Sequence, residues 1–234
     1  MNSHLDPTGL RARRAWWPSA ASCAFVAAGL EILSFGLSQY LVQRPTAPPG
    51  TTYMGFMIAV AVIGIAAQAR ALWGVGRRQQ AVAPVSARLG QWAVATYVVV
   101  SGLLYILFIL MPVWAYAFSL WPAGAVGNVF HVALIPLTLA FGCLGWASRG
   151  DSGPLQRWAS RGLLVVMMFG VFSVIRILFG LFGLPTGQRW LWLASLAVAL
   201  RAATWAAVGA WLRSGTVVLQ SSDGLSNPNL GTQD

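Results

Sequence analysis

Six long blocks of apolar residues divide the chain and leave it little choice of fold. They span Pro18–Val42, Tyr53–Gly74, Gln91–Met111, Val126–Ala147, Gly162–Leu184 and Trp190–Leu212. At a helical rise of about 1.5 Å per residue, each block can cross a hydrocarbon core of about 30 Å. Only helices satisfy their own backbone hydrogen bonds within such a segment, and the sequence lacks the alternating pattern of membrane β-strands. The blocks therefore predict an all-α, polytopic integral membrane bundle of six transmembrane helices.

The low content of charged residues supports this prediction. Charged residues make up 9% of the chain, whereas soluble domains carry about 25%. The formal charge of +10 raises the question of a nucleic-acid partner. However, the arginines lie at the ends of the apolar blocks and do not form one basic face with stacking aromatic residues. We therefore expect a lipid bilayer and no nucleic acid as partner. The absence of lysine indicates the coding bias of a GC-rich bacterium.

The arginines also predict the orientation of the bundle. Eleven fall on one side of the predicted membrane, at Arg11, Arg13, Arg14, Arg70, Arg77, Arg78, Arg88, Arg149, Arg157, Arg161 and Arg213. The opposite loops hold Arg44 and Arg189. Because basic residues accumulate in cytoplasmic loops, we expect an N-in/C-in protein of the bacterial inner membrane. Residues 1–17 would form a cytoplasmic segment, residues 18–213 the transmembrane domain, and residues 214–234 a disordered cytoplasmic tail.

Three ionisable residues lie deep inside the predicted helices. Glu31 and Arg201 are each roughly 17 to 20 Å from the ends of their helices, and Arg176 is about 12 Å from the outer end of its own. An ionisable group at such a depth is costly unless it is paired or neutralised, which makes it a candidate for function. We expect Glu31 to pair with Arg176 or Arg201. The pair could lock helices together or form the centre of a ligand or ion site.

Two arginines and one glutamate leave a surplus positive charge at this depth. The surplus arginine could reach water, bind a lipid phosphate or accept an anionic ligand. We expect no metal and no cofactor. The two cysteines and two histidines lack metal-ligand spacing, the histidines are too few for haem pairs, and a retinal Schiff base requires lysine.

A secondary polar face is predicted on two other helices. Asn128, His131 and Thr138 follow a three-four spacing in the fourth block and so share one side of that helix. Tyr97 and Tyr105 share one side of the third helix in the same way. Such faces more often serve helix packing than binding. His131 could instead relay protons, because histidine changes its charge near neutral pH.

Two prolines are expected to interrupt helices. Pro112 should end the third helix, because proline cannot donate the backbone hydrogen bond that continues it. Pro136 lies in the middle of the fourth block, where it should kink the helix or free a carbonyl group. A kink at Pro136 would be a candidate hinge for gating.

Three functions fit these features, since no catalytic or phosphate-binding motif occurs. The first is a small transporter or permease-like protein for an anionic or amphipathic (lipidic) solute, with Glu31, Arg176 and Arg201 at its centre. The second is a membrane enzyme acting on a lipid or isoprenoid with Glu31 as the acid, by analogy of architecture with integral-membrane terpene cyclases. The third is a non-catalytic immunity protein, regulator or subunit of a complex. We prefer transport, because small polytopic proteins without catalytic motifs most often move or sense solutes.

Overall fold

The computed structural model describes residues 19–42, 51–118, 131–150, 153–181 and 191–225. Every regular element in these ranges is helical. The elements are α2 (Ala20–Val42), α3 (Thr51–Gln79), α4 (Pro84–Phe118), the 3₁₀ turn η1 (His131–Ala133), α6 (Leu134–Ala147), α7 (Pro154–Leu181) and α8 (Leu191–Leu225). The predicted all-α class is confirmed for the part of the chain that is described.

Five helices are long and apolar enough to cross a membrane, namely α2, α3, α4, α7 and α8. The sixth, α6, is apolar but has 14 residues. At helical rise it is about 21 Å long, which is less than a hydrocarbon core of about 30 Å. The predicted fourth block began at Val126, and its residues 126–130 lie outside the described ranges. The described helices are those of a membrane protein.

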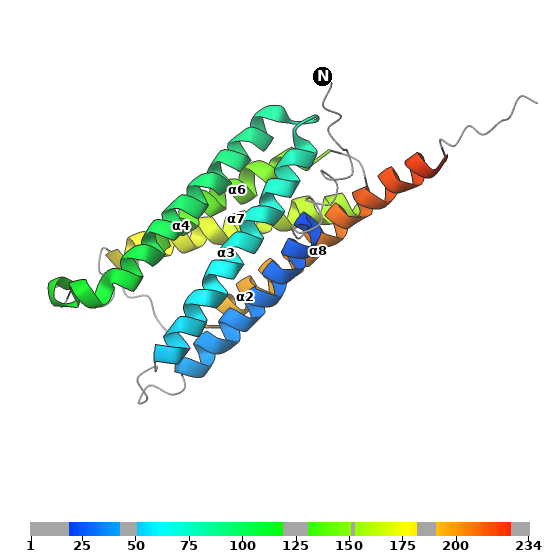
Figure 1. Ribbon diagram of the computed structural model, residues 1–234. Helices are drawn as coiled ribbons and strands as arrows, with labels where there is room; N and C mark the ends of the chain where they lie inside the picture. The colour runs from blue at the N-terminus through cyan, green and yellow to red at the C-terminus, as the bar shows by residue number, and fades with distance from the viewer. Residues whose placement is uncertain (1–18, 43–50, 119–130, 151–152, 182–190, 226–234) are drawn as a thin grey trace, which may run out of the picture.

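The prediction that Pro112 ends the third helix is wrong. The helix α4 continues through Pro112 to Phe118, and its last turns bend away from the rest of the helix (Figure 1). The missing N–H of Pro112 bends the helix but does not end it, because the neighbouring turns keep their hydrogen bonds. Pro136 is the third residue of α6. There it lies in the first turn, whose N–H groups have no partner within the helix. Residues 126–130 of the predicted block lie outside the described ranges, so the kink stays a prediction.

Several helices extend beyond the apolar blocks that predicted them. The helix α3 continues to Gln79, and α7 already begins at Pro154, a favoured first residue of a helix. The helix α8 continues to Leu225, so residues 214–225 of the expected tail are helical, and residues 226–234 lie outside the described ranges. Hydrophobicity marks the part of a helix that contacts lipid, whereas a helix ends where its backbone hydrogen bonds end.

The helices form a closed ring. Each packs against the next one along the chain, and α8 closes the ring by packing against α2. The helix α3 also contacts α6 and α8 across the ring. In Figure 1, α2 and α3 run side by side, whereas the distance between α3 and α4 widens towards the end of α4.

One end of the ring carries many arginines, among them Arg77, Arg78, Arg88, Arg149 and Arg157. This arginine-rich end is where α2, α4 and α7 begin and where α3 and α6 end. The core lies towards it. The largest fully buried side chains among the described residues are Trp205, Leu72, Leu144, Leu163, Val75, Val94 and Val208. Small residues allow the helices to approach closely here. The arginine-rich end is therefore the tightly packed part of the described bundle.

Candidate functional site

Glu31 of α2 and Arg201 of α8 form an ion pair, which is one of the two pairings that the sequence predicts. The guanidinium nitrogen Nη2 of Arg201 lies 3.3 Å from Oε2 of Glu31. The Glu31 side chain is 13% exposed and that of Arg201 is 31% exposed. Strong charge-assisted hydrogen bonds are shorter, about 2.7 to 2.9 Å. The Nε atom of Arg201 is buried and has no hydrogen-bond partner among the described residues. The pair balances the two charges, but its geometry is loose.

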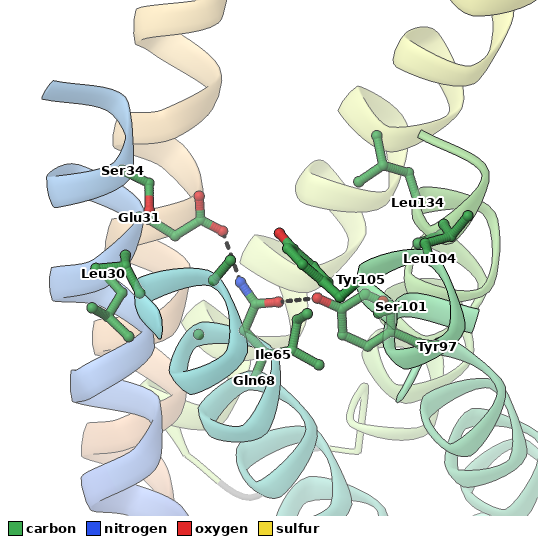
Figure 2. Close-up of a pocket in the computed structure, with 14 residues that line it drawn as sticks. Leu30, Glu31, Ser34, Ile65, Gln68, Tyr97, Ser101, Leu104, Tyr105 and Leu134 are labelled. Carbon is green, nitrogen blue, oxygen red and sulfur yellow. Dashed lines mark hydrogen bonds between the residues drawn. The ribbon is translucent and has the colours of Figure 1, made fainter. Parts of the chain in front are cut away.

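Gln68 of α3 binds the other oxygen of the Glu31 carboxylate. Its Nε2 donates to Oε1 of Glu31 at 3.0 Å. The hydroxyl of Tyr97 on α4 in turn donates to Oε1 of Gln68 at 2.9 Å. Figure 2 shows these two hydrogen bonds as one chain from α4 through α3 to α2. With Arg201 on α8, four helices meet in a polar network in which Gln68 and Arg201 contact Glu31 and Tyr97 donates to Gln68.

Gln68 is not among the predicted site residues, because it is uncharged and belongs to neither of the two predicted polar faces. A glutamine inside the apolar stretch Ile58–Gln79 is itself a signal, because a buried amide needs partners for both its oxygen and its nitrogen. In this structure it has both, and they are Glu31 and Tyr97. Gln68 therefore joins the carboxylate to the tyrosine.

The network borders a pocket of about 220 Å³ among α2, α3, α4, η1 and the start of α6 (Figure 2). Its lining residues are Leu30, Glu31, Ser34, Val60, Ala61, Gly64, Ile65, Gln68, Tyr97, Ser101, Leu104, Tyr105, Ala133 and Leu134. Carboxylate, amide and hydroxyl groups thus share the pocket with aliphatic side chains. Such a mixture suits a ligand that is polar at one end and apolar at the other.

The residues of the Glu31 network lie at the end of the pocket that is nearer to the arginine-rich end of the bundle. Because α2 and α4 run away from the arginine-rich end and α3 runs towards it, Gln68 and Tyr97 are the lining residues of their helices nearest to that end. Ser34, Tyr105 and Val60 lie farther from it on the same three helices. The pocket thus extends from the level of the Glu31 network away from the tightly packed end of the bundle.

Small residues on α3 provide the space. Ala61 and Gly64 both line the pocket. A Cβ atom built on Gly64 would meet a single neighbour, Cδ1 of Leu30, at an ordinary contact distance of 3.9 Å. Larger side chains at these two positions would fill the volume that a ligand could occupy.

The two predicted tyrosines belong to this site. Tyr97 is buried and bonded to Gln68, and Tyr105 points from α4 into the pocket on the side opposite Glu31 (Figure 2). The sequence predicts both tyrosines on a secondary polar face, whereas in the structure they line the same pocket as Glu31. The remaining residues of that secondary face are not brought there.

Thr138 on α6 packs against α7 instead. It is buried, and a Cβ atom added to Gly170 would collide with its hydroxyl. His131 lies in η1, but its side chain is outside the described residues, and Asn128 is outside them altogether. Arg176 lies in α7, with its side chain also outside them. For Thr138, helix packing is thus the role that the contacts support.

The site combines a carboxylate, a nearby cation and hydroxyl groups at the wall of a pocket between apolar helices. Ionisable groups in this position bind ions or polar head groups, or exchange protons. No protein-family model matches the chain, and no curated protein or solved structure is significantly similar to it.

Proposed function

We propose that the protein crosses the inner membrane of a bacterium six times, with both termini in the cytoplasm. The proposed sixth span combines α6 with residues that precede it. The distribution of arginine supports this topology, because Arg77, Arg78, Arg88, Arg149 and Arg157, which lie in or next to α3, α4, α6 and α7, gather at one end of the ring. That end would face the cytoplasm. The pocket would then extend towards the opposite side of the membrane.

We propose further that the protein is a small transporter that binds an amphipathic solute at the Glu31 pocket. The observation that carries this proposal is an ion-paired carboxylate on the wall of a pocket between apolar helices. Charged groups inside membranes most often mark substrate or ion pathways. A pocket that lies above a tightly packed end is also what one state of an alternating-access transporter requires.

Glu31 could couple this transport to protons. In the present arrangement its carboxylate accepts a hydrogen bond from Gln68 and faces the Arg201 cation. A protonated Glu31 would lose its attraction for Arg201, whereas its carbonyl oxygen would still accept the hydrogen bond from Gln68. This change weakens the contact of α2 with α8. Protonation would thus favour a different packing of these helices.

A flux assay in vesicles tests the proposal. The full chain is reconstituted into vesicles that contain a pH-sensitive dye, and amphipathic amines, alcohols and carboxylates are added outside. Wild type should show solute-dependent proton movement, which Glu31→Gln should lower at least about tenfold, an effect of about 1.4 kcal/mol. Thr96→Val is the matched control, because this hydroxyl bonds to a carbonyl of its own helix and does not line the pocket.

The two possible failures have different meanings. Solute-dependent proton movement in Glu31→Gln equal to that of wild type would contradict the coupling. A wild-type protein that moves none of these solutes would contradict transport.

The enzyme alternative draws on Tyr97 and Tyr105, which line the same pocket and could shield a carbocation. A general acid must carry a proton, whereas Glu31 here accepts from Gln68 and pairs with Arg201. Solute binding itself needs no proton on Glu31, and we therefore prefer transport. Membranes incubated with prenylated substrates distinguish the two, since a cyclised product that is lost in Glu31→Gln would support the enzyme.

A further inference from the structure

The pocket exposes one member of the ion pair and not the other. Glu31 is a lining residue, whereas Arg201 is not. None of the other described lining residues carries a charge, since they are aliphatic, hydroxyl or amide side chains. A ligand in the pocket would therefore meet the carboxylate of the pair first, with the guanidinium behind it on α8.

Glu31 has capacity to bind a further donor. A carboxylate offers about four lone-pair directions, and the contacts described are one from Gln68 and one from Arg201. The Arg201 contact of 3.3 Å is longer than the best charge-assisted bonds of about 2.7 to 2.9 Å. A second cation could therefore share or displace it. An anion in the same place would approach the negative charge of Glu31 with no described cation on the pocket side.

The rest of the lining suits a small organic cation. Tyr97 and Tyr105 provide aromatic surface, which attracts cations. Leu30, Ile65 and Leu104 provide aliphatic wall. The volume of about 220 Å³ is below the range of about 300 to 1,000 Å³ that is typical for drug-sized ligands, so the bound part must be small.

We propose that the ligand of this pocket is a small amphipathic cation whose ammonium group binds Glu31 in competition with Arg201. The inference rests on the pocket being the solute site of the proposed transporter, and it specifies the charge of that solute. When the ammonium group binds, Arg201 would lose part of its contact with Glu31. The occupied pocket would thereby weaken the contact between α2 and α8.

A series of three probes that differ in charge tests the inference. Phenylpropylammonium, phenylpropanol and phenylpropanoate share one apolar part and carry a positive, neutral and negative head group. Their binding to the purified full-length protein is measured by calorimetry at neutral pH. The ammonium should bind at least about tenfold more tightly than the alcohol, a difference of about 1.4 kcal/mol, and the carboxylate should bind most weakly.

Variants of Glu31 and Arg201 test whether the preference for the ammonium depends on the ion pair. Arg201→Gln should bind the ammonium more tightly than wild type, because the competing cation is gone, and a purely structural pair would not show this gain. Glu31→Gln should lose the preference for the ammonium over the alcohol. If this variant does not fold, Glu31→Gln with Arg201→Gln removes both charges together and should show the same loss of preference. Thr96→Val should keep the preference of wild type, since it lies outside the pocket.

The remaining outcomes overturn the inference in distinguishable ways. Equal binding of the three probes, or tightest binding of the carboxylate, would overturn the choice of a cation. If that binding is also abolished by Gly64→Leu, the pocket is still the solute site and the proposed transporter stands. If no probe binds to wild type, the proposal of a cationic ligand is overturned, and the vesicle flux assay decides separately about transport.

Discussion

Gln68 donates its side-chain amide to Glu31 across the contact of α2 with α3, at 3.0 Å. The same amide accepts a hydrogen bond from Tyr97, so one uncharged side chain satisfies a carboxylate on one side and a phenol on the other. Its removal leaves the partly buried carboxylate of Glu31 and the buried phenol of Tyr97 without this partner. Substitution of Gln68 should therefore destabilise the site more than substitution of an uncharged residue usually does.

Gln68→Leu should lower the free energy of unfolding by about 1 to 3 kcal/mol, because unsatisfied buried polar groups cost about that much. Tyr97→Phe should cost less, about 1 kcal/mol, since it leaves a single amide oxygen unpaired. Unfolding by SDS titration in mixed micelles measures both values. Thr96→Val on the same helix as Tyr97 should leave stability unchanged. Equal stability of Gln68→Leu and Thr96→Val would show that the network does not stabilise the fold.

The Glu31–Arg201 pair predicts non-additive substitutions. Arg201→Leu alone leaves the carboxylate without its cation, and Glu31→Gln alone leaves the guanidinium without its anion. The double variant removes both charges and should be more stable than the sum of the single effects predicts, by about 1 to 3 kcal/mol. The same SDS titration on the four proteins measures this coupling. Additive effects would mean that the two side chains do not interact.

Close packing of α7 on α8 predicts a rescue. A Cβ atom added to Gly162 would lie 2.7 Å from Oγ1 and 3.0 Å from Cγ2 of Thr204. Gly162→Ala should therefore destabilise the protein by about 1 to 3 kcal/mol. Thr204→Ala should restore most of this loss, because it removes both atoms. Gly102→Ala is the control, since nothing lies within 4 Å of its added Cβ. A loss of the same size at Gly102 would point to a general effect of the substitution.

Gly64→Leu should fill the pocket without disturbing the fold. Its side chain would extend into the volume next to Leu30, and the added Cβ atom itself meets ordinary contacts. Solute binding should fall at least about tenfold, or by about 1.4 kcal/mol, while the melting temperature in detergent stays near that of wild type. Binding that persists unchanged would mean that the solute occupies another place.

The proposed topology predicts where reporters are active. Green fluorescent protein fused after Asp234 should fluoresce, because that end would lie in the cytoplasm, and alkaline phosphatase at the same place should be inactive. Alkaline phosphatase inserted within residues 43–50 should be active, since that segment would face the other side. The reverse pattern at both places would invert the orientation, and activity of the phosphatase at both would contradict an even number of spans.

The charged pair could be predicted from the sequence, but its surroundings could not. Hydrocarbon penalises an isolated charge, so Glu31 needed a partner, and two arginines were available. The choice of Arg201 depends on α8 closing the ring against α2, which hydrophobicity does not encode. The pocket depends on small residues of α3, such as Gly64, at the point where they face α2 and α4. A pattern of spacing places Tyr97 on a face but does not say which helix that face meets.

The closing of the ring by its first and last helices also constrains how the protein is made. The carboxylate of Glu31 enters the bilayer early in synthesis, whereas Arg201 follows only with the last helix. Gln68 arrives with α3 and can bind Glu31 before Arg201 is made. Until α8 is inserted, the amide of Gln68 is the partner that the described contacts offer to Glu31. Gln68 would then be the temporary partner of Glu31 during biogenesis, and the charged pair would form as the final step of assembly.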